Sequence, residues 1–116
     1  MPAYPTLRRR ADFEAVTRSG SHSATRLLVL RARRTDGPTT RIGLATSASL
    51  GGAVERNRVR RRMRALVRAR HEEMGAGWDL LVIMKPDARD ATFGELEAAL
   101  HAALSHAGVV AEVRAG

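Results

Sequence analysis

GGAVERNRVRRRMR, residues 51–64, opens the most basic segment of this 116-residue chain. Residues 53–70 contain eight arginines and one acidic residue, a charge of +7, whereas the whole chain carries +8. Runs this basic are commonly disordered, but this one has apolar residues at helical spacing: Val59, Met63, Leu66 and Val67. The spacing predicts an amphipathic helix with an apolar stripe on a core and arginines on the remaining arc. A rigid row of guanidinium groups is typical of a phosphate-binding surface.

Composition limits what the chain can do. Its length predicts one domain with a single modest core. The absence of cysteine excludes disulfide scaffolds, thiolate zinc sites and cysteine nucleophiles. No apolar run approaches the roughly 20 residues of a membrane span, and the basic start leads into no signal-like segment, so a cytoplasmic location is expected. With a pI of about 11.6, nucleic acid is the expected partner, ahead of a membrane surface.

The charge is divided along the sequence. Residues 1–52 carry +6, residues 53–70 carry +7, and residues 71–116 carry −5. We expect the first two thirds to face a polyanion and the last third to support them.

Before the arginine segment, the pattern predicts a helix over residues 7–20 that ends at Gly20. A polar stretch, residues 21–23, leads to a strand over residues 26–34. A turn at residues 35–38 then predicts that residues 41–47 return as an antiparallel strand.

After Gly51 and Gly52, the arginine helix is expected to run to about Met74. Residues 79–85 form a nearly unbroken apolar run that ends before Pro86, which predicts a strand buried on both faces. Residues 92–107 have the pattern of an amphipathic helix.

These elements predict a single α+β domain over residues 1–116. The expected fold is a small two-layer sandwich in the order α-β-β-β-α-β-α. Its core spans about residues 7–108, with a short basic arm before it and a short tail after it.

Several motifs together resemble the protein component of bacterial ribonuclease P. The segment AVERNRVRR (residues 53–61), followed by Arg64, resembles the "RNR" signature of that family. Further matches are DFxxV (12–16) before Gly20, IGLxxS (42–47), Asp79 opening the strand that closes with Lys85-Pro86, and FGEL (93–96). The resemblance covers roughly residues 7–108, and it rests on the ordered set of motifs.

The resemblance implies a function and a division of labour. The partners would be a large catalytic RNA and precursor tRNA, with no obligate protein partner and no membrane. Together the two subunits would remove the 5′ leader by hydrolysis of one phosphodiester. Mg²⁺ bound by the RNA would supply the chemistry, and the protein alone would be inactive. The family also implies that the arginine helix joins its two strands in an uncommon left-handed crossover.

Residues that match the signature are implied to contact the catalytic RNA, and Arg68 is added because it shares their helical face. The set is Arg56, Asn57, Arg58, Arg60, Arg61, Arg64 and Arg68. For Asn57, a hydrogen bond at the helix start is an equally good interpretation. Arg62 points to a different arc and is expected to be an ordinary solvated charge.

The resemblance also implies a cleft between the first helix and the sheet that holds the single-stranded leader. The matching residues are Arg9, Arg10, Phe13, Val16, Thr17, Arg26, Leu28, Leu30, Arg31 and Ser47. Phe13 has an equally good interpretation as a core residue, and the two roles are compatible.

The chain departs from the family pattern in this cleft. Thr17, Leu28 and Arg31 stand where relatives often carry aromatics, and Ala48-Ser49 where they often carry basic residues; Ala65 also departs from the usual charged residue. Because only four residues are aromatic, stacking on bases is mostly missing. Leader binding is expected to rely on arginines and backbone groups, with little sequence preference.

Two other functional classes compete with this interpretation. A structural RNA-binding protein of the ribosomal kind fits the composition, whereas a self-sufficient nuclease needs a catalytic constellation. The four histidines (His22, His71, His101 and His106) suggest no such constellation, and no catalytic or metal-binding residue is predicted. Asp87 and Asp90 could hold a metal in principle, but their loop has the composition of a polar turn.

Overall fold

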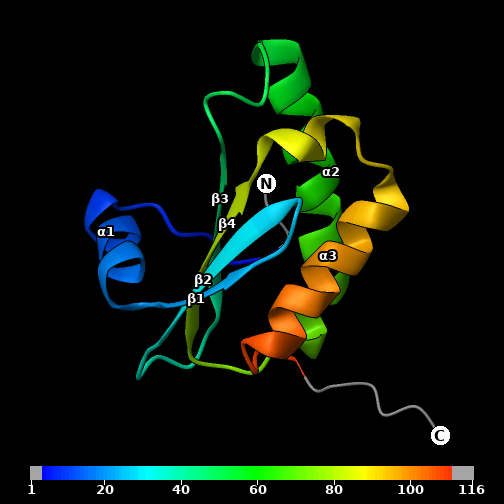
Figure 1. Ribbon diagram of the computed structural model, residues 1–116. Coiled ribbons are helices and arrows are strands. Elements are labelled where there is room, and N and C mark those ends of the chain that lie inside the picture. Colours follow the sequence, from blue (N-terminus) through cyan, green and yellow to red (C-terminus); the bar gives the residue numbers. More distant parts are fainter. Residues whose placement is uncertain (1–3, 111–116) are drawn as a thin grey trace, which may run out of the picture.

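The computed structural model describes residues 4–110, which form one four-stranded sheet flanked by helices (Figure 1). In chain order the elements are α1 (Arg10–Ser19), β1 (Ser21–Ala24), β2 (Leu28–Arg34), β3 (Arg41–Thr46), α2 (Ala53–Arg70), η1 (His71–Glu73), β4 (Trp78–Met84), η2 (Pro86–Asp90) and α3 (Phe93–His106). The α+β class and the predicted order α-β-β-β-α-β-α are confirmed.

The last strand in the sequence, β4, lies inside the sheet, whose order is β1-β2-β4-β3. It pairs antiparallel with β2 and parallel with β3. The predicted antiparallel pairing of residues 26–34 with residues 41–47 is therefore wrong, because β4 separates these strands. The physical reason lies in β4 itself: an apolar run with buried residues on both faces is most stable with a strand on each side and helices above and below.

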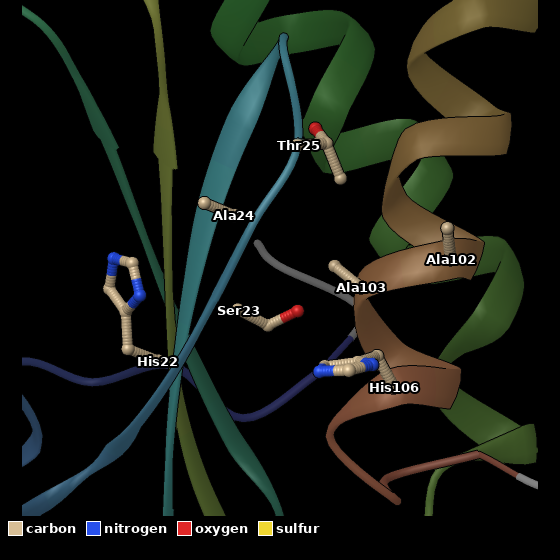
Figure 2. A pocket seen from close by; sticks show the side chains of 7 residues that line it. All are labelled: His22, Ser23, Ala24, Thr25, Ala102, Ala103 and His106. Atoms are coloured by element: carbon tan, nitrogen blue, oxygen red, sulfur yellow. The ribbon is translucent and has the colours of Figure 1, made fainter.

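The predicted order counted three strands before α2, but the predicted ranges located only two of them, and the range that was not predicted is that of β1. Residues 21–23 were interpreted as a polar stretch, but Ser21–Ala24 forms β1 and pairs antiparallel with β2. Only Ser23 of this edge strand is buried, so β1 has no apolar pattern to reveal it. Figure 2 shows Ser23 pointing toward α3, whereas His22 lies on the opposite side of the strand.

The two faces of the sheet carry different helices (Figure 1). On one face α2 and α3 cover the main core, which includes Leu28, Leu30, Leu80, Val82 and Met84. On the other face α1 packs through a smaller cluster of Leu7, Val16 and Leu81. α1 is therefore an additional helix outside the sandwich of sheet and paired helices.

The N-terminal segment does not join α1 as early as predicted, since the helix begins at Arg10 rather than at Leu7. Instead, residues 5–7 run beside the outer edge of β3. The Leu7 N–H donates to Ile42 O and the Ile42 N–H donates to Pro5 O, at 3.3 and 3.0 Å. These bonds cover part of an edge that would otherwise be free to pair.

The arginine helix is anchored as its sequence predicts. All four residues of the apolar stripe are buried: Val59, Met63, Leu66 and Val67. The helix ends at Arg70, and η1 completes the segment that was expected to be helical to about Met74. Gly51 precedes it with a φ of 156°, a left-handed conformation that favours glycine.

Candidate nucleic-acid interface

Two arginines of α2 are used inside the protein. Arg58 Nη2 donates to Arg89 O at 3.1 Å, and Arg62 Nη1 donates to Ala91 O at 3.4 Å. They are one helical turn apart on the side of α2 that faces η2, so both reach backbone carbonyls of the same loop. The expectation that Arg62 is an ordinary solvated charge is wrong. Arg58, predicted to contact RNA, is engaged with this loop.

Arg70 is a third internal arginine. Its guanidinium lies 3.3 Å from Glu73 and 3.9 Å from Glu97, and it contacts His101 Nδ1 at 3.0 Å. These contacts join the end of α2 to α3. This role was not predicted, because Glu97 and His101 are far from Arg70 along the chain.

Arg60 is half-exposed and held in place by two weak hydrogen bonds. Its Nη1 donates to Asn57 Oδ1 at 3.2 Å and its Nη2 donates to Thr46 Oγ1 at 3.4 Å. In the structure the Asn57 side chain thus orients an arginine and is not seen to bond the start of the helix. Its predicted contact with RNA stays a prediction.

The remaining arginines of the helix form the free part of the surface. Arg61, Arg64 and Arg68 are exposed, and no hydrogen bond or ion pair joins their side chains to any part of residues 4–110. Arg56 is half-exposed and likewise has no such contact within that range. Burial raises the pKa of the Tyr4 phenol. The positive charges of Arg64 and Arg68 lie close enough to lower it, but by less, so the net shift is upward.

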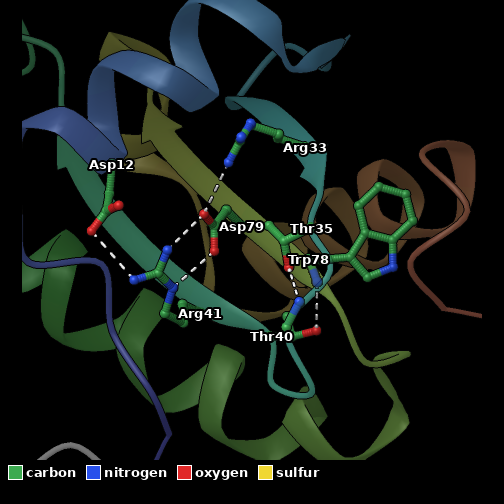
Figure 3. A network of polar contacts seen from close by, with 8 residues as sticks. Asp12, Arg33, Thr35, Thr40, Arg41, Trp78 and Asp79 are labelled. Carbon is green, nitrogen blue, oxygen red and sulfur yellow. Dashed lines mark hydrogen bonds and ion pairs between the residues drawn. The ribbon is translucent and has the colours of Figure 1, made fainter.

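On the other side of the sheet, α1 is fixed by an ion network (Figure 3). Arg41 donates from Nε and Nη2 to the two carboxylate oxygens of Asp79 at 3.0 and 2.8 Å, and from Nη1 to Asp12 at 3.3 Å. Arg33 adds an ion pair of 3.7 Å to Asp79, which is only 1% exposed. The hydrogen bond to Asp79 is the largest reason that the pKa of Arg41 is raised. Asp12 belongs to α1, so the network attaches this helix to β3 and β4.

This attachment leaves a cleft along one flank of α1. Val16 points to the sheet and is 0% exposed, and Asp12 occupies the flank toward Arg41. Phe13 and Thr17 are one turn apart on the opposite flank and both line a hollow on the helix surface. Arg31 closes the far end, since its Nη1 donates to Thr17 O at 3.3 Å.

Beside this flank of α1, the sheet presents a row of small and apolar residues that the sequence analysis missed. Strand pairing places Ala24 opposite Val29, Val29 opposite Ile83, and Ile83 opposite Ala45. These residues lie on the same face of the sheet as Leu81, which α1 covers. They form the neighbouring row across the strands, beside the row that contains Leu81. Val29, Ile83 and Ala45 are consequently half-exposed.

Several predicted cleft residues lie elsewhere. Leu28 and Leu30 are 0% exposed on the opposite face of the sheet, beneath α2 and α3, and Val16 is buried under α1. Arg26 lies at the turn between β1 and β2. Its guanidinium is 3.6 Å from the carboxylate of Asp87 in η2 and 3.6 Å from that of Glu95 at the start of α3. Their assignment to the cleft is wrong. For the leucines the reason is that alternation in a strand identifies two faces without saying which helix covers each.

The other predicted positions remain compatible with the cleft. Arg9 and Arg10 are exposed at the start of α1, where Arg10 pairs with Glu14 at 3.1 Å. Ser47 is half-exposed just after β3. No contact in the structure tests their role in binding.

The structure supports the interpretation of Phe13 as a packed residue, and its role in leader binding stays a prediction. Its ring packs over Gly43, where an added Cβ would come within 2.6 Å of Phe13 Cε1. The glycine therefore leaves the room that Cε1 and Cζ of the ring occupy against β3. The ring is still half-exposed and can present a face to a ligand.

Acidic side chains and histidines do not gather into a metal site in the part of the chain that the structure describes. Within residues 4–110, no three of them are placed to hold an ion. Asp87 and Asp90 each lie beside an arginine, Arg26 and Arg89 respectively. In the same range, no helix combines the length and hydropathy needed to cross a membrane.

Comparison with known proteins adds independent findings. The sequence model of the family described as Ribonuclease P matches residues 1–108. The "Ribonuclease P protein component" of Acidothermus cellulolyticus is 41% identical over 100 residues, covering 84% of this chain and 83% of that protein. The protein of the same description from Beutenbergia cavernae is 38% identical over 114 residues, covering 97% and 96%. The structure of the Staphylococcus aureus RNase P protein superposes with a TM-score of 0.83 at 26% identity, covering 90% of this chain and 96% of that one.

Proposed function

Because this chain belongs to the ribonuclease P protein family, we propose that it is the protein subunit of a ribonucleoprotein that removes the 5′ leader from precursor tRNA. Relatives that align over most of its length carry the name "Ribonuclease P protein component". A partnership with the catalytic RNA, action on precursor tRNA and a cytoplasmic location are parts of this proposal. No obligate protein partner is included.

One observation carries the proposal. Three exposed arginines on a rigid helix, Arg61, Arg64 and Arg68, have no partner within residues 4–110, while the arginines beside them are bound internally. A free guanidinium can donate two parallel hydrogen bonds to a phosphate, and a helix fixes the spacing of such groups. With Arg60 and Arg56 beside them, these residues form the proposed surface for the catalytic RNA.

The cleft beside α1 is the proposed binding site of the leader. The adjacent row of Val29, Ile83 and Ala45 on the sheet is half-exposed and uncharged, and Phe13 supplies one aromatic ring. Arg31 retains guanidinium N–H groups beyond the one bonded to Thr17 O. Such a cleft contacts sugar and phosphate groups of any sequence, with stacking limited to one ring. We therefore expect weak sequence preference in the leader.

In this proposal the protein positions RNA and the catalytic RNA performs the hydrolysis with bound Mg²⁺. The ion would activate the attacking water and stabilise charge on the phosphodiester. The protein's contribution is electrostatic and steric: its arginines offset the repulsion between two polyanions, and the cleft holds the leader next to them. Protein alone is expected to be inactive.

The competing possibility is a structural RNA-binding protein with no role in cleavage, which the basic composition fits equally well. Cleavage of a precursor tRNA at low Mg²⁺ separates the two. Four samples are compared: protein alone, catalytic RNA alone, both, and neither. We expect product only when both are present. Product from the protein alone would overturn the assignment of the chemistry to RNA, and no gain from added protein would favour the structural role.

A further inference from the structure

One outer edge of the sheet is left uncovered by the described part of the chain. β3 lies at one end of the strand order, and residues 5–7 run beside it. β1 lies at the other end, and no further segment of residues 4–110 pairs with its outer side. An uncovered edge offers unpaired backbone N–H and C=O groups, which proteins often protect with proline, lysine or a bulge. β1 contains neither of these residues, and its register with β2 has no bulge.

The register of the β1–β2 hairpin identifies which backbone groups of β1 point outward. The Thr25 N–H donates to Leu28 O at 2.8 Å, so these two residues occupy a hydrogen-bonded position of the hairpin. Hydrogen-bonded and non-hydrogen-bonded positions alternate along an antiparallel pair. Ser23 is therefore bonded to β2, whereas the N–H and C=O groups of His22 and Ala24 face away from it. The edge thus presents two donors and two acceptors at the spacing of a β-strand.

A hollow of about 290 Å³ lies beside this edge, between β1 and α3 (Figure 2). On α3 it is lined by the small side chains of Ala102 and Ala103 and by the imidazole of His106. Ser23 points toward it from β1 and is only 8% exposed. No hydrogen bond joins the Ser23 hydroxyl to another group of residues 4–110. Because a nearly buried hydroxyl normally has a partner, the hollow contains a polar group suited to an incoming side chain.

The edge and the hollow together fit an extended polypeptide. A strand added to β1 bonds the outward groups of His22 and Ala24, and it directs every second side chain to the α3 face of the sheet. The side chain that lies opposite Ser23 then enters the hollow. RNA lacks the alternating donors and acceptors of a peptide backbone, and no arginine lines this hollow to bind a phosphate.

The charges around the edge favour an acidic segment. None of the residues that line the hollow is acidic, and two of them, His22 and His106, are histidines. Arg18 precedes β1 and Arg26 follows it, and both are exposed. The two carboxylates near this end of the strand already lie beside Arg26. A second copy of this chain is a poor occupant, because each copy carries +8 and like charges repel.

We propose that β1 and the adjoining hollow bind an extended, acidic segment of another protein, which adds a strand to the sheet and places a carboxylate opposite Ser23. The Ser23 hydroxyl and the ring N–H of His106 donate to this carboxylate. The site lies at the opposite edge of the sheet from β3 and does not involve α2. It therefore leaves the proposed surface for the catalytic RNA open, and the proposal is independent of the proposed function.

The test begins with a display library of short random peptides selected against the full protein, in enough salt to weaken contacts with exposed arginines. Peptides that bind Ala102→Phe equally well are discarded, because this variant fills the hollow and keeps every arginine. We expect the remaining peptides to be acidic. They should bind Ala98→Phe as they bind the natural protein, since Ala98 is exposed one turn earlier on α3 and does not line the hollow. Thermal unfolding confirms that both variants are folded.

Amide hydrogen exchange then tests the strand pairing in the natural protein, without any variant. With a selected peptide bound, the amides of His22 and Ala24 should become protected, whereas the amide of Ser23, already bonded to β2, should change little. Ala24→Pro removes one outward N–H at a sheet edge, where proline is tolerated. It should raise the Kd of the peptide by about 2- to 13-fold, the factor that corresponds to one hydrogen bond.

The opposing outcomes are distinct. The proposal is overturned if no peptide remains after the selection, if the remaining peptides are not acidic, or if a bound peptide leaves His22 and Ala24 unprotected. Protection of these amides by raising the protein concentration alone, together with a dimer in sedimentation, would assign the edge to a second copy and also overturn it. Cleavage of precursor tRNA is a separate measurement: a protein that gives no gain there contradicts the proposed function and leaves this site unaffected.

Discussion

At the scale of single residues, arginines close together on α2 do different work according to what lies opposite each of them. Arg58 and Arg62 bond backbone carbonyls in η2 and just after it. Arg70 lies beside two carboxylates, and Arg64 is exposed to solvent. A guanidinium bonded to its own protein has fewer donors left for RNA. Charge counting along the sequence therefore overstates the number of arginines that can bind phosphate.

A matched pair of substitutions tests this distinction. Arg64→Ala should weaken binding to the catalytic RNA and reduce the slope of log K against log salt by about 0.9 per lost phosphate contact, the value for duplex DNA. Arg62→Ala should leave the slope nearly unchanged and instead lower the free energy of unfolding by about 0.5–1.5 kcal/mol, since it removes an internal hydrogen bond. Binding is measured across a salt series. Equal changes of slope for the two variants would contradict the division.

Gly43 is the residue on which the position of Phe13 depends. An alanine Cβ would lie 2.6 Å from Phe13 Cε1 and 3.1 Å from Cζ. Gly43→Ala should therefore lower the free energy of unfolding by about 1–3 kcal/mol, the usual cost of overpacking. Adding Phe13→Leu should recover part of the loss, because it removes the clashing atoms.

The control for this prediction is Gly37→Ala, where the nearest atom to the added Cβ is Thr35 Oγ1 at 3.6 Å. It should change stability by less than about 0.5 kcal/mol. Urea unfolding measures the natural protein, these three variants and Phe13→Leu alone. Additive losses in the double variant would show that ring and glycine are not coupled.

At the scale of elements, α1 is attached to the sheet by a small apolar cluster and by one ion pair, Asp12–Arg41. Its only buried residue is Val16, whereas Asp12 joins a network whose centre, Asp79, is almost fully buried. The positive charges of Arg33 and Arg41 compensate the negative charge of the Asp79 carboxylate. The network and the apolar cluster together hold α1 over one row of the sheet, and the next row stays half-exposed.

Removing Asp79, at the centre of the network, should lower the free energy of unfolding by more than removing Asp12 at its rim. Asp79→Ala leaves Arg41 and Arg33 without their shared partner and should lower the free energy of unfolding by about 1.5–3 kcal/mol, the range for hydrogen bonds to charged groups, because both arginines are partly exposed and can be hydrated. Asp12→Ala removes one partly exposed contact and should cost about 1 kcal/mol or less. Denaturant midpoints measure both. Similar losses for the two variants would mean that the network is not organised around Asp79.

The start of α3 has a capping box with a titratable member. Thr92 Oγ1 accepts from the Glu95 N–H at 3.1 Å, and the Glu95 carboxylate accepts from the Thr92 N–H at 2.8 Å. The bond to the Thr92 backbone is the main reason that the pKa of Glu95 is lowered. A lowered pKa stabilises the fold fully above the ordinary value of 4.5, and this stabilisation is lost as the pH falls through the lower, folded value.

Glu95→Gln should keep the reciprocal bonds, because glutamine also serves at this position, and should lose only the pH dependence. The difference in unfolding free energy between natural protein and variant should be constant above about pH 4.5 and shift in favour of the variant below it. Thr92→Ala should cost about 1 kcal/mol at neutral pH. A difference that stays constant into acid would show that Glu95 does not contribute through its charge.

The elements also show where sequence reasoning succeeds. The stripe on α2 and the apolar run of β4 were predicted because each pattern has one physical solution: a helix with one buried face, and a strand buried on both. β1 has no such pattern, with one buried residue in four. The strand order and the buried face of Leu28 and Leu30 depend on which elements pack together over long separations, which short-range periodicity does not contain. Arg58 and Arg62 bond backbone carbonyl groups, which every residue possesses. No side-chain pattern in the sequence therefore predicts these contacts.

At the scale of the whole molecule, charge and structure are divided in the same way. The segments that supply the cleft and the arginine helix are strongly positive, and the segment that supplies β4 and α3 is negative. Within α2, repulsion among the exposed arginines opposes folding. Salt reduces repulsion over distances beyond about 8 Å at 0.15 M.

The melting temperature of the free protein should therefore rise between 10 and 200 mM NaCl. A variant with Arg61, Arg64 and Arg68 all changed to Gln should melt higher at low salt and respond less to added salt, since glutamine retains good helix propensity. Calorimetry at several salt concentrations measures both. A salt response of equal size in the variant would place the repulsion elsewhere in the chain.

The position of β4 has a consequence for how the molecule is made. β2 and β3 have both been synthesised by residue 46, yet each pairs with β4, which is complete only at residue 84. At a synthesis rate of 5–20 residues per second this is a delay of roughly two to eight seconds. During it the basic helix emerges without the strand that completes its core. A chain interrupted before residue 78 can form only the β1–β2 hairpin of this sheet, so the fold is obtained in a single late step.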